Sequence, residues 1–222
     1  GEIVPFDIEG VAAGNQSCGH RFYSPEFFPV RTGSAFLEDL RTRHVEPCAK
    51  RRREMILAGA ELAPSGTTVE WSDALIDENV FLTEWPMPLL GTYADAYLEL
   101  PEPVLQTAMA KHERMFPIRQ DSGSLAPRFL WVRNSGEEAT VRGGNEWVLN
   151  ARFNDAKFFF DEDKKHTMAD YLARTEAMLY HERLGTVRQR ADRLSWLMAA
   201  LVGGEQALQA GLYAKADLTT GL

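Results

Sequence analysis

The sequence is poor in cysteine and has no long uninterrupted apolar run. Its 222 residues include only two cysteines, Cys18 and Cys48, whose separation fits neither a paired zinc motif nor a disulfide framework. We therefore expect reduced thiols and a cytoplasmic location. No apolar stretch approaches the roughly 20 residues of a membrane-spanning helix, and we recognise no signal peptide. We expect no membrane partner.

Positive charge is also scarce. Asp and Glu number 32 against 24 Lys and Arg, which gives a formal net charge of -8. This balance argues against attraction of nucleic acid by the whole surface, and we expect no DNA partner. A polyanion would therefore have to bind at a local basic patch. Hydrophobic residues make up 45% of the chain, enough for one large domain or two small ones.

The pattern of apolar residues changes along the chain. Up to about residue 136, short strands alternate with helices, and "FPIRQDSGSLAPRFLWVRN" predicts a hairpin that turns at Asp121 to Gly123. Ser72 is the expected N-cap of a helix at 73–85. From 137 onward the periodicity is helical, with Leu194, Leu197, Met198 and Leu201 as one expected apolar stripe. We expect an α+β domain over 1–136 and an all-helical region over 137–222.

The motifs of common enzyme classes are missing. The chain has no phosphate-binding glycine loop with its lysine and no G-x-S-x-G nucleophile elbow. His112 and His181 each precede a glutamate, but neither has the second histidine that a zinc-binding helix requires. His20 beside Arg21 could act as a general base, although a histidine that satisfies a local hydrogen bond is the commoner case. We predict no metal and no cofactor site.

Two basic clusters are the best candidates for contact with RNA. The first is four consecutive cations on one helix, and the second follows "YHE" near residue 180. Their members are Lys50, Arg51, Arg52 and Arg53, and Arg183, Arg188, Arg190 and Arg193. A solvated helix face is the simpler interpretation of the first cluster, and a contact with a phosphate backbone is the alternative.

The stretch "RGGNEWVLNARFNDAKFFFDEDKKH", residues 142–166, is dense in charge and aromatic rings. Helical spacing predicts a buried stripe of Leu149, Phe153, Ala156 and Phe160, and Arg152 can pair with Asp155. The successive rings at 158–160 cover most of the helix circumference. This implies a helix between two structural units, or a surface for a missing one.

Several motifs occur together in an order typical of one family. "GNEWVLNARFNDAKFFFDEDKK" is followed by "HERLGTVRQRADRL" and "AKADLTT", and preceded by "GHRF", "EWPMPLLGTY", "AYLELP", "FPI" and "LAPRFLWVRN". The chain resembles the β subunit of the bacterial, two-subunit glycyl-tRNA synthetases over nearly its whole length. We interpret it as an internal fragment of such a subunit.

The resemblance implies a function shared by a complex. In that family the α subunit forms glycyl-adenylate from glycine and ATP, with Mg²⁺, and the β subunit supplies recognition of glycine tRNA within an α/β heterotetramer. The first domain would resemble a B3/B4-type synthetase domain and the helical region an HD domain truncated at its C-terminus. Asp217 lies in the matching "KADL" motif, but we find no further HD metal ligands. The alternatives are an HD-type metal-dependent phosphohydrolase and a purely structural adaptor.

Some positions depart from the family pattern. The segment Glu113, Arg114, Met115, Phe116 and Pro117 stands where the family often has Gln-Lys-Tyr-Phe-Pro. A tyrosine hydroxyl is therefore absent and only the basic charge is kept. Any role that the resemblance implies for those side chains is correspondingly weaker than the family assignment itself.

Overall fold

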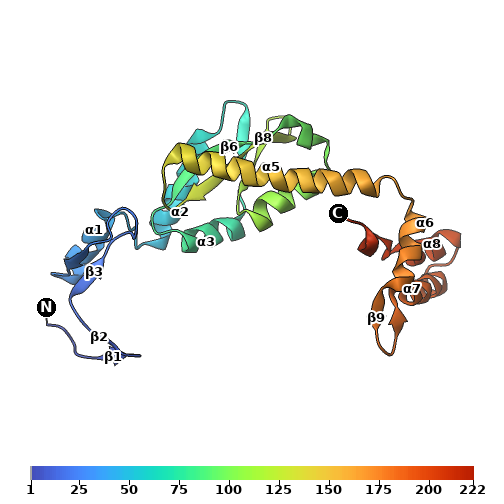
Figure 1. Cartoon of the computed structure of the whole chain (residues 1–222), viewed down its shortest axis with the longest axis horizontal. Helices are drawn as coiled ribbons and strands as arrows, with labels where there is room; N and C mark the ends of the chain where they lie inside the picture. The colour runs from blue at the N-terminus through green and yellow to red at the C-terminus, as the bar shows by residue number, and fades with distance from the viewer. Residues whose placement is uncertain (1) are drawn as a thin grey trace. The chain divides into compact units, whose positions relative to one another are not determined.

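A four-stranded antiparallel sheet is the centre of an α+β fold (Figure 1). The computed structural model describes residues 2–222, and the chain divides into two units, one ending at Phe153 and one spanning Asn154–Leu222. The boundary falls inside a long helix, α5 (Glu138–Asp163). The domain division after residue 136 stays a prediction. Within residues 2–222, no helix combines the length and apolar character needed to cross a membrane.

The sheet of the first unit has the strand order β5-β7-β8-β6. The strands are β5 (Thr67–Val69), β6 (Met87–Thr92), β7 (Phe116–Gln120) and β8 (Leu125–Arg133). The β7–β8 hairpin confirms the predicted turn, where Gly123 has a φ of 89° that suits glycine.

Helices α2 (Ala49–Leu57) and α3 (Asp73–Leu82) pack on one face of this sheet. Ser72 is the N-cap residue of α3, as predicted, although its side chain makes no capping hydrogen bond. Alternate residues of β7 and β8 face the helices, as the two-residue period of a strand requires. The resulting core consists of Ile56, Val69, Leu75, Ile76, Val80, Phe116, Ile118, Ala126, Leu130 and Val132.

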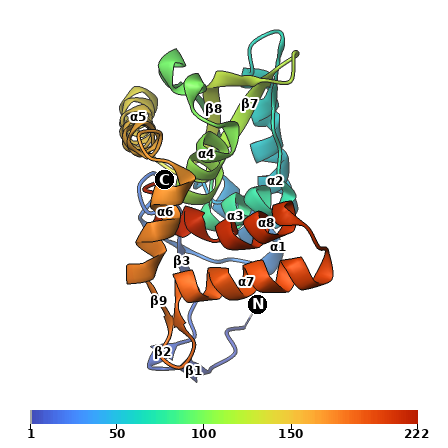
Figure 2. The same cartoon turned by 90° about the vertical axis from the view of Figure 1, so that its right-hand side faces the viewer.

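The first half of α5 covers the opposite face. Figure 2 shows β7 and β8 between α5 and α2. Leu149 and Phe153 are fully buried, and the Phe153 ring packs against Tyr93 and Tyr97 at centroid distances of 5.0 and 5.4 Å. Helix α5 is tied to the end of β6 by its polar side chains, since Glu146 Oε1 accepts a hydrogen bond of 2.8 Å from the Thr92 N–H.

The predicted buried stripe on α5 is therefore only partly correct. Leu149 and Phe153 are buried as expected, whereas Ala156 and Phe160 are only half-buried. Phe158 and Phe159, which lie outside the stripe, are exposed and pack edge to face on each other. Arg152 pairs with Glu113 rather than with the predicted Asp155, because the loop before β7 brings that carboxylate to the helix.

The N-terminal part of the first unit contains short elements. They are β1 (Asp7–Ile8), β2 (Val11–Ala12), β3 (Gln16–Cys18), β4 (Phe27–Pro29) and α1 (Gly33–Arg41). The segment between β6 and β7 holds α4 (Glu102–Thr107), followed by a single π-helical turn, Ala108–His112.

The second unit is mainly helical. It contains α6 (Met168–Arg174), α7 (Val187–Leu201) and α8 (Glu205–Tyr213). The expectation of an all-helical region is wrong at one place, where β9 (Leu179–His181) and β10 (Gly185–Thr186) form a hairpin. Gly185 has a φ of 80°, and Thr186 then starts α7 by forming a reciprocal capping box with Gln189. Turn and cap residues here override the helical periodicity.

Helices α7 and α8 pack through small residues. Ser195 Oγ donates a hydrogen bond of 2.8 Å to the Leu208 carbonyl, and a Cβ added at Gly211 would lie 2.6 Å from the backbone of Ser195. The buried positions of α7 are Val187, Ala191 and Ser195. The predicted stripe of larger residues is only partly correct, because Leu194 and Met198 are half-buried but Leu197 and Leu201 are exposed. The close backbone approach requires small side chains at the fully buried positions.

Candidate nucleic-acid interface

The first basic cluster lies on α2. Lys50 and Arg51 have exposed side chains, whereas Arg52 and Arg53 are half-buried. Arg52 donates from Nε to the Val80 carbonyl at 2.8 Å and from Nη1 to the Glu46 carbonyl at 2.6 Å. Its guanidinium therefore joins α2 to α3 and to the preceding loop. Nothing in the sequence pattern distinguishes Arg52 from its neighbours.

Arg53 is also engaged within the protein. Its guanidinium pairs with Asp77 at 2.8 Å and with Asp73, both on α3. Among residues 2–222 Lys50 makes no ion pair, and Arg51 makes only a long one of 3.8 Å to Glu46. Of the four predicted residues, Lys50 and Arg51 are thus the two whose charges remain available to a phosphate.

Glu46 is a buried carboxylate at the base of this cluster. It accepts hydrogen bonds from Arg41 Nε and from the Cys48 N–H, each at 2.9 Å. Burial by itself would raise the pKa of Glu46, but the hydrogen bonds from Arg41 and Cys48 and the charges of Arg41 and Arg51 outweigh it, so that the pKa falls below its ordinary value. The ionised carboxylate thereby fixes the start of α2 and the direction of its arginines.

The second basic cluster lies on the β9–β10 hairpin and on α7. Arg188 pairs with Asp192 at 3.1 Å, and the Arg190 guanidinium stacks over the Tyr180 ring at 4.3 Å. The side chains of Arg183 and Arg193 are exposed and have no ion-pair partner in the described part of the chain. Among the described residues, Arg183 and Arg193 therefore have neither an ion-pair partner nor an aromatic ring to stack on, and Arg190 has only the ring of Tyr180. The two clusters belong to different units.

The histidines differ in their surroundings. His20 is fully buried; its Nδ1 accepts a hydrogen bond of 3.2 Å from the Phe22 N–H, while no described group bonds to its Nε2. The bond to Phe22 is the local hydrogen bond that we considered commoner than a general-base role. His112 lies in the π-helical turn after α4, and His181 ends β9.

The described residues contain no set of side chains suited to bind a metal ion. No group of three or more His, Cys, Asp and Glu side chains among residues 2–222 has an arrangement that could hold an ion. Asp217 lies in a 3-10 turn, Ala216–Thr219, where its side chain is exposed and the neighbouring Ala216 is buried. The buried member of the "KADL" motif is thus an alanine that packs in the core of the second unit.

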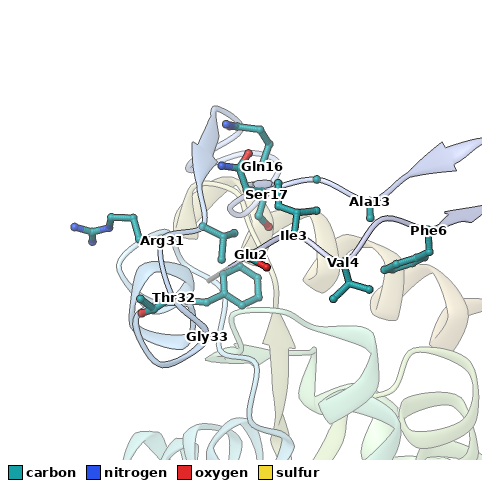
Figure 3. Close-up of a pocket in the computed structure, with 14 residues that line it drawn as sticks. Glu2, Ile3, Val4, Phe6, Ala13, Gln16, Ser17, Arg31, Thr32 and Gly33 are labelled. Carbon is teal, nitrogen blue, oxygen red and sulfur yellow. The ribbon is translucent and has the colours of Figure 1, made fainter.

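A pocket of about 470 Å³ lies beside the N-terminus of α1 (Figure 3). Ile3, Val4 and Phe6 are among its apolar lining residues. In Figure 3 the Arg31 guanidinium points away from the other labelled side chains, and it pairs with Asp39. This pocket has a mixed lining, in which apolar side chains stand beside polar ones and the carboxylate of Glu2.

A second pocket, of about 480 Å³, is polar and was not apparent from the sequence. It lies where α3 and β8 end, beside the turn before β7 and the start of α5. Its lining residues are Asn79, Leu82, Thr83, Glu113, Arg114, Trp131, Val132, Arg133, Asn134, Ser135, Val141 and Asn145. They come from separate segments of the chain, so no local motif marks them. Of these residues, Trp131 and Arg133 in "FLWVRN" are the two whose types suggest ligand binding.

The whole chain matches one family model, described as glycyl-tRNA synthetase beta subunit, over residues 1–222. It is 39% identical over 237 residues to the glycine–tRNA ligase beta subunit of Phenylobacterium zucineum (strain HLK1), covering 100% of this chain and 35% of that protein. It is 39% identical over 236 residues to the one of Desulfitobacterium hafniense (strain Y51), covering 99% and 33%. The chain spans about a third of the length of the curated relatives it matches.

Proposed function

Because the chain belongs to the glycyl-tRNA synthetase β-subunit family, we propose that it contributes tRNA recognition and subunit assembly to the ATP-dependent attachment of glycine to its tRNA. Its partners are then an α subunit and glycine tRNA, in the cytoplasm. ATP and Mg²⁺ act at the α subunit, and the chain by itself is not catalytic. The family match over the whole chain carries this proposal.

The exposed cations are the proposed contacts with the tRNA backbone. Lys50 and Arg51 on α2, and Arg183 and Arg193 in the second unit, project into solvent with little or no pairing inside the protein. Unpaired cations of this kind release counterions from phosphates without first breaking an internal ion pair. Arg52, Arg53, Arg188 and Arg190 would support the same surfaces while keeping their internal contacts.

The finer fold assignment belongs to the proposal as well. A first unit with an antiparallel sheet between helices is compatible with a B3/B4-like domain, and a helical second unit is compatible with part of an HD-like domain. The β9–β10 hairpin is an addition to the helical pattern that we expected. Superposition of each unit separately on solved domains of both types would test the two assignments.

Binding of glycine tRNA by the complete enzyme tests the proposed contacts. Two double variants remove the charges: Lys50→Gln with Arg51→Gln, and Arg183→Gln with Arg193→Gln. Each should weaken tRNA binding and reduce the slope of log affinity against log salt concentration by about one unit per lost phosphate contact. Adenylate formation should not change. Arg31→Gln, which removes an exposed arginine outside both clusters, is the matched control.

Two results would contradict the assignment of these residues. The first is binding of wild-type strength and salt dependence by both double variants. The second is a loss of adenylate formation equal to the loss of tRNA affinity, because that indicates damage to assembly rather than a missing phosphate contact. Arg52→Gln is unsuitable as a binding probe, since it removes the hydrogen bonds to Val80 and Glu46 that hold α2 in place.

A structural adaptor is the second candidate, and one surface favours it. Trp196, Leu201 and Val202 are exposed around the C-terminal half of α7, where a soluble helix would ordinarily carry polar groups. An adaptor predicts normal tRNA binding by both arginine-cluster variants, together with loss of the assembled enzyme when Trp196 and Leu201 become Ser. Size-exclusion chromatography of the α and β subunits gives that second readout.

A further inference from the structure

We infer that the polar pocket at the end of β8 holds one unpaired nucleotide of the bound RNA. The inference rests on the proposed tRNA-binding function and adds a site to it. The pocket measures about 480 Å³, within the roughly 300 to 1,000 Å³ typical of small-ligand sites. It is formed entirely by residues of the first unit, so its shape depends on one folded body.

The charged groups of the pocket favour an anion. Arg114 and Arg133 line it together with a single carboxylate, Glu113. Glu113 is already paired with Arg152 at 2.5 Å, so its charge is offset by a residue outside the lining. Arg114 is itself paired with Glu78 at 2.5 Å, whereas the carboxylate neighbour of Arg133, Glu138, is 3.9 Å away, so Arg133 is the lining cation whose charge is least compensated.

The Arg133 guanidinium is not fully hydrogen-bonded within the protein. Its side chain is largely buried; Nη1 donates to the Gly136 carbonyl, and Nε is buried with no hydrogen-bond partner in the described residues. A buried donor without an acceptor is unfavourable, and native structures rarely keep one without a reason. The Nε donor is closed to solvent, but Nη2 has only the 3.9 Å ion pair with Glu138 and can donate to a phosphate or base oxygen in the pocket, because arginine presents several donors in one plane.

Arg114 is held in an unusual backbone conformation. Its φ is 55°, in the left-handed region that favours glycine, and the buried Asn79 amide donates to its carbonyl at 3.4 Å. A strained residue that the surrounding structure holds in place is a reason to look for a functional role. Glycine would fit this backbone conformation better, and the Arg114 side chain lines the pocket while it pairs with Glu78.

The remaining lining groups suit a base rather than a simple anion. Trp131 is half-buried and offers an aromatic ring on which a base can stack. Asn134 uses Oδ1 to accept from the Glu84 and Trp85 N–H groups, which leaves its NH₂ for a ligand. Asn145 donates from Nδ2 to Val141, which leaves its carbonyl oxygen. A donor and an acceptor beside an aromatic ring match the edge and face of an unstacked base.

Arg114→Gly in the complete enzyme is the decisive variant. It removes the guanidinium and its half-exposed ion pair with Glu78 while relieving the backbone, so the fold should stay close to wild-type stability. We expect about ten-fold weaker binding of a short single-stranded RNA oligonucleotide, and a smaller salt slope. Trp131→Leu should weaken binding by a similar factor, while Trp131→Phe keeps a ring and restores most of it.

The probes separate this site from the proposed function. A blunt RNA duplex of the same sequence should bind equally to wild type and Arg114→Gly, because paired bases cannot enter the pocket. Arg31→Gln is again the matched control. If both pocket variants bind the oligonucleotide like the wild type, the nucleotide site is overturned while tRNA binding elsewhere stands. If the wild-type enzyme binds neither glycine tRNA nor the oligonucleotide, the proposed function itself fails.

Discussion

The ring of Phe129 on β8 lies directly against the Cα of Gly91, its register partner on β6. A Cβ at position 91 would lie 2.8 Å from Cε1 of that ring, closer than packed carbon atoms allow. Glycine is thus required by a neighbouring side chain and not by its own dihedral angles. The pair sets how closely β6 and β8 approach on the face that α5 covers.

Gly91→Ala should therefore destabilise the first unit by about 2 kcal/mol, because Phe129 has to leave its fully buried position. Unfolding in urea measures the change in free energy. Gly143→Ala is the control, since Gly143 lies inside helix α5 and a Cβ there would meet nothing within 4 Å. That control should raise stability by up to about 1 kcal/mol. Equal effects of both changes would contradict the crowding explanation.

Glu46 gives the protein a predictable sensitivity to acid. Its pKa is lowered in the folded state, so its contribution to stability is present above the ordinary pKa and is lost as the pH falls through the folded value. Glu46→Gln should cost about 1 to 2 kcal/mol at neutral pH, because it replaces charged hydrogen bonds from Arg41 and the Cys48 N–H by weaker neutral ones. The difference between the two proteins should shrink below about pH 4.

A neighbouring carboxylate provides the comparison for Glu46. Glu38 pairs with the same arginine at 3.4 Å, but it is exposed. Glu38→Gln should change the free energy of unfolding by less than about 1 kcal/mol at any pH. Urea titrations of the three proteins at neutral and acidic pH give the result. A gap between wild type and Glu46→Gln that does not depend on pH would refute the linkage.

Gly211→Ala should loosen the second unit without disturbing the first. The added methyl group meets the backbone of Leu194 and Ser195 at 2.6 Å, and backbone cannot move aside as a side chain can. We expect a loss of about 2 kcal/mol and faster hydrogen exchange in α7 and α8. Gln209→Ala, on the exposed side of the same helix, should leave exchange unchanged. Faster exchange confined to the first unit would contradict the packing described for Gly211.

Local patterns predicted those features that depend on neighbouring residues in the chain. The turn at Asp121 to Gly123 and the N-cap position of Ser72 followed from residue types that favour those conformations. The predicted apolar stripe on α7 is correct only in part, since Leu194 and Met198 are half-buried. Leucines at helical spacing predicted the buried face, but the approach of Gly211 selects Ala191 and Ser195 instead.

The sequence by itself determined the α+β class, the strand–turn–strand of the main hairpin, and the family to which the chain belongs. Only the tertiary structure decided which cations remain available. Lys50 and Arg52 are both cations in "KRRRE", and the sequence does not tell which is available. In the structure the Arg52 guanidinium donates hydrogen bonds to carbonyls of α3 and of the loop at Glu46. The polar pocket likewise needs distant segments to meet. Contacts between residues far apart in the chain depend on packing in three dimensions, which local periodicity does not encode.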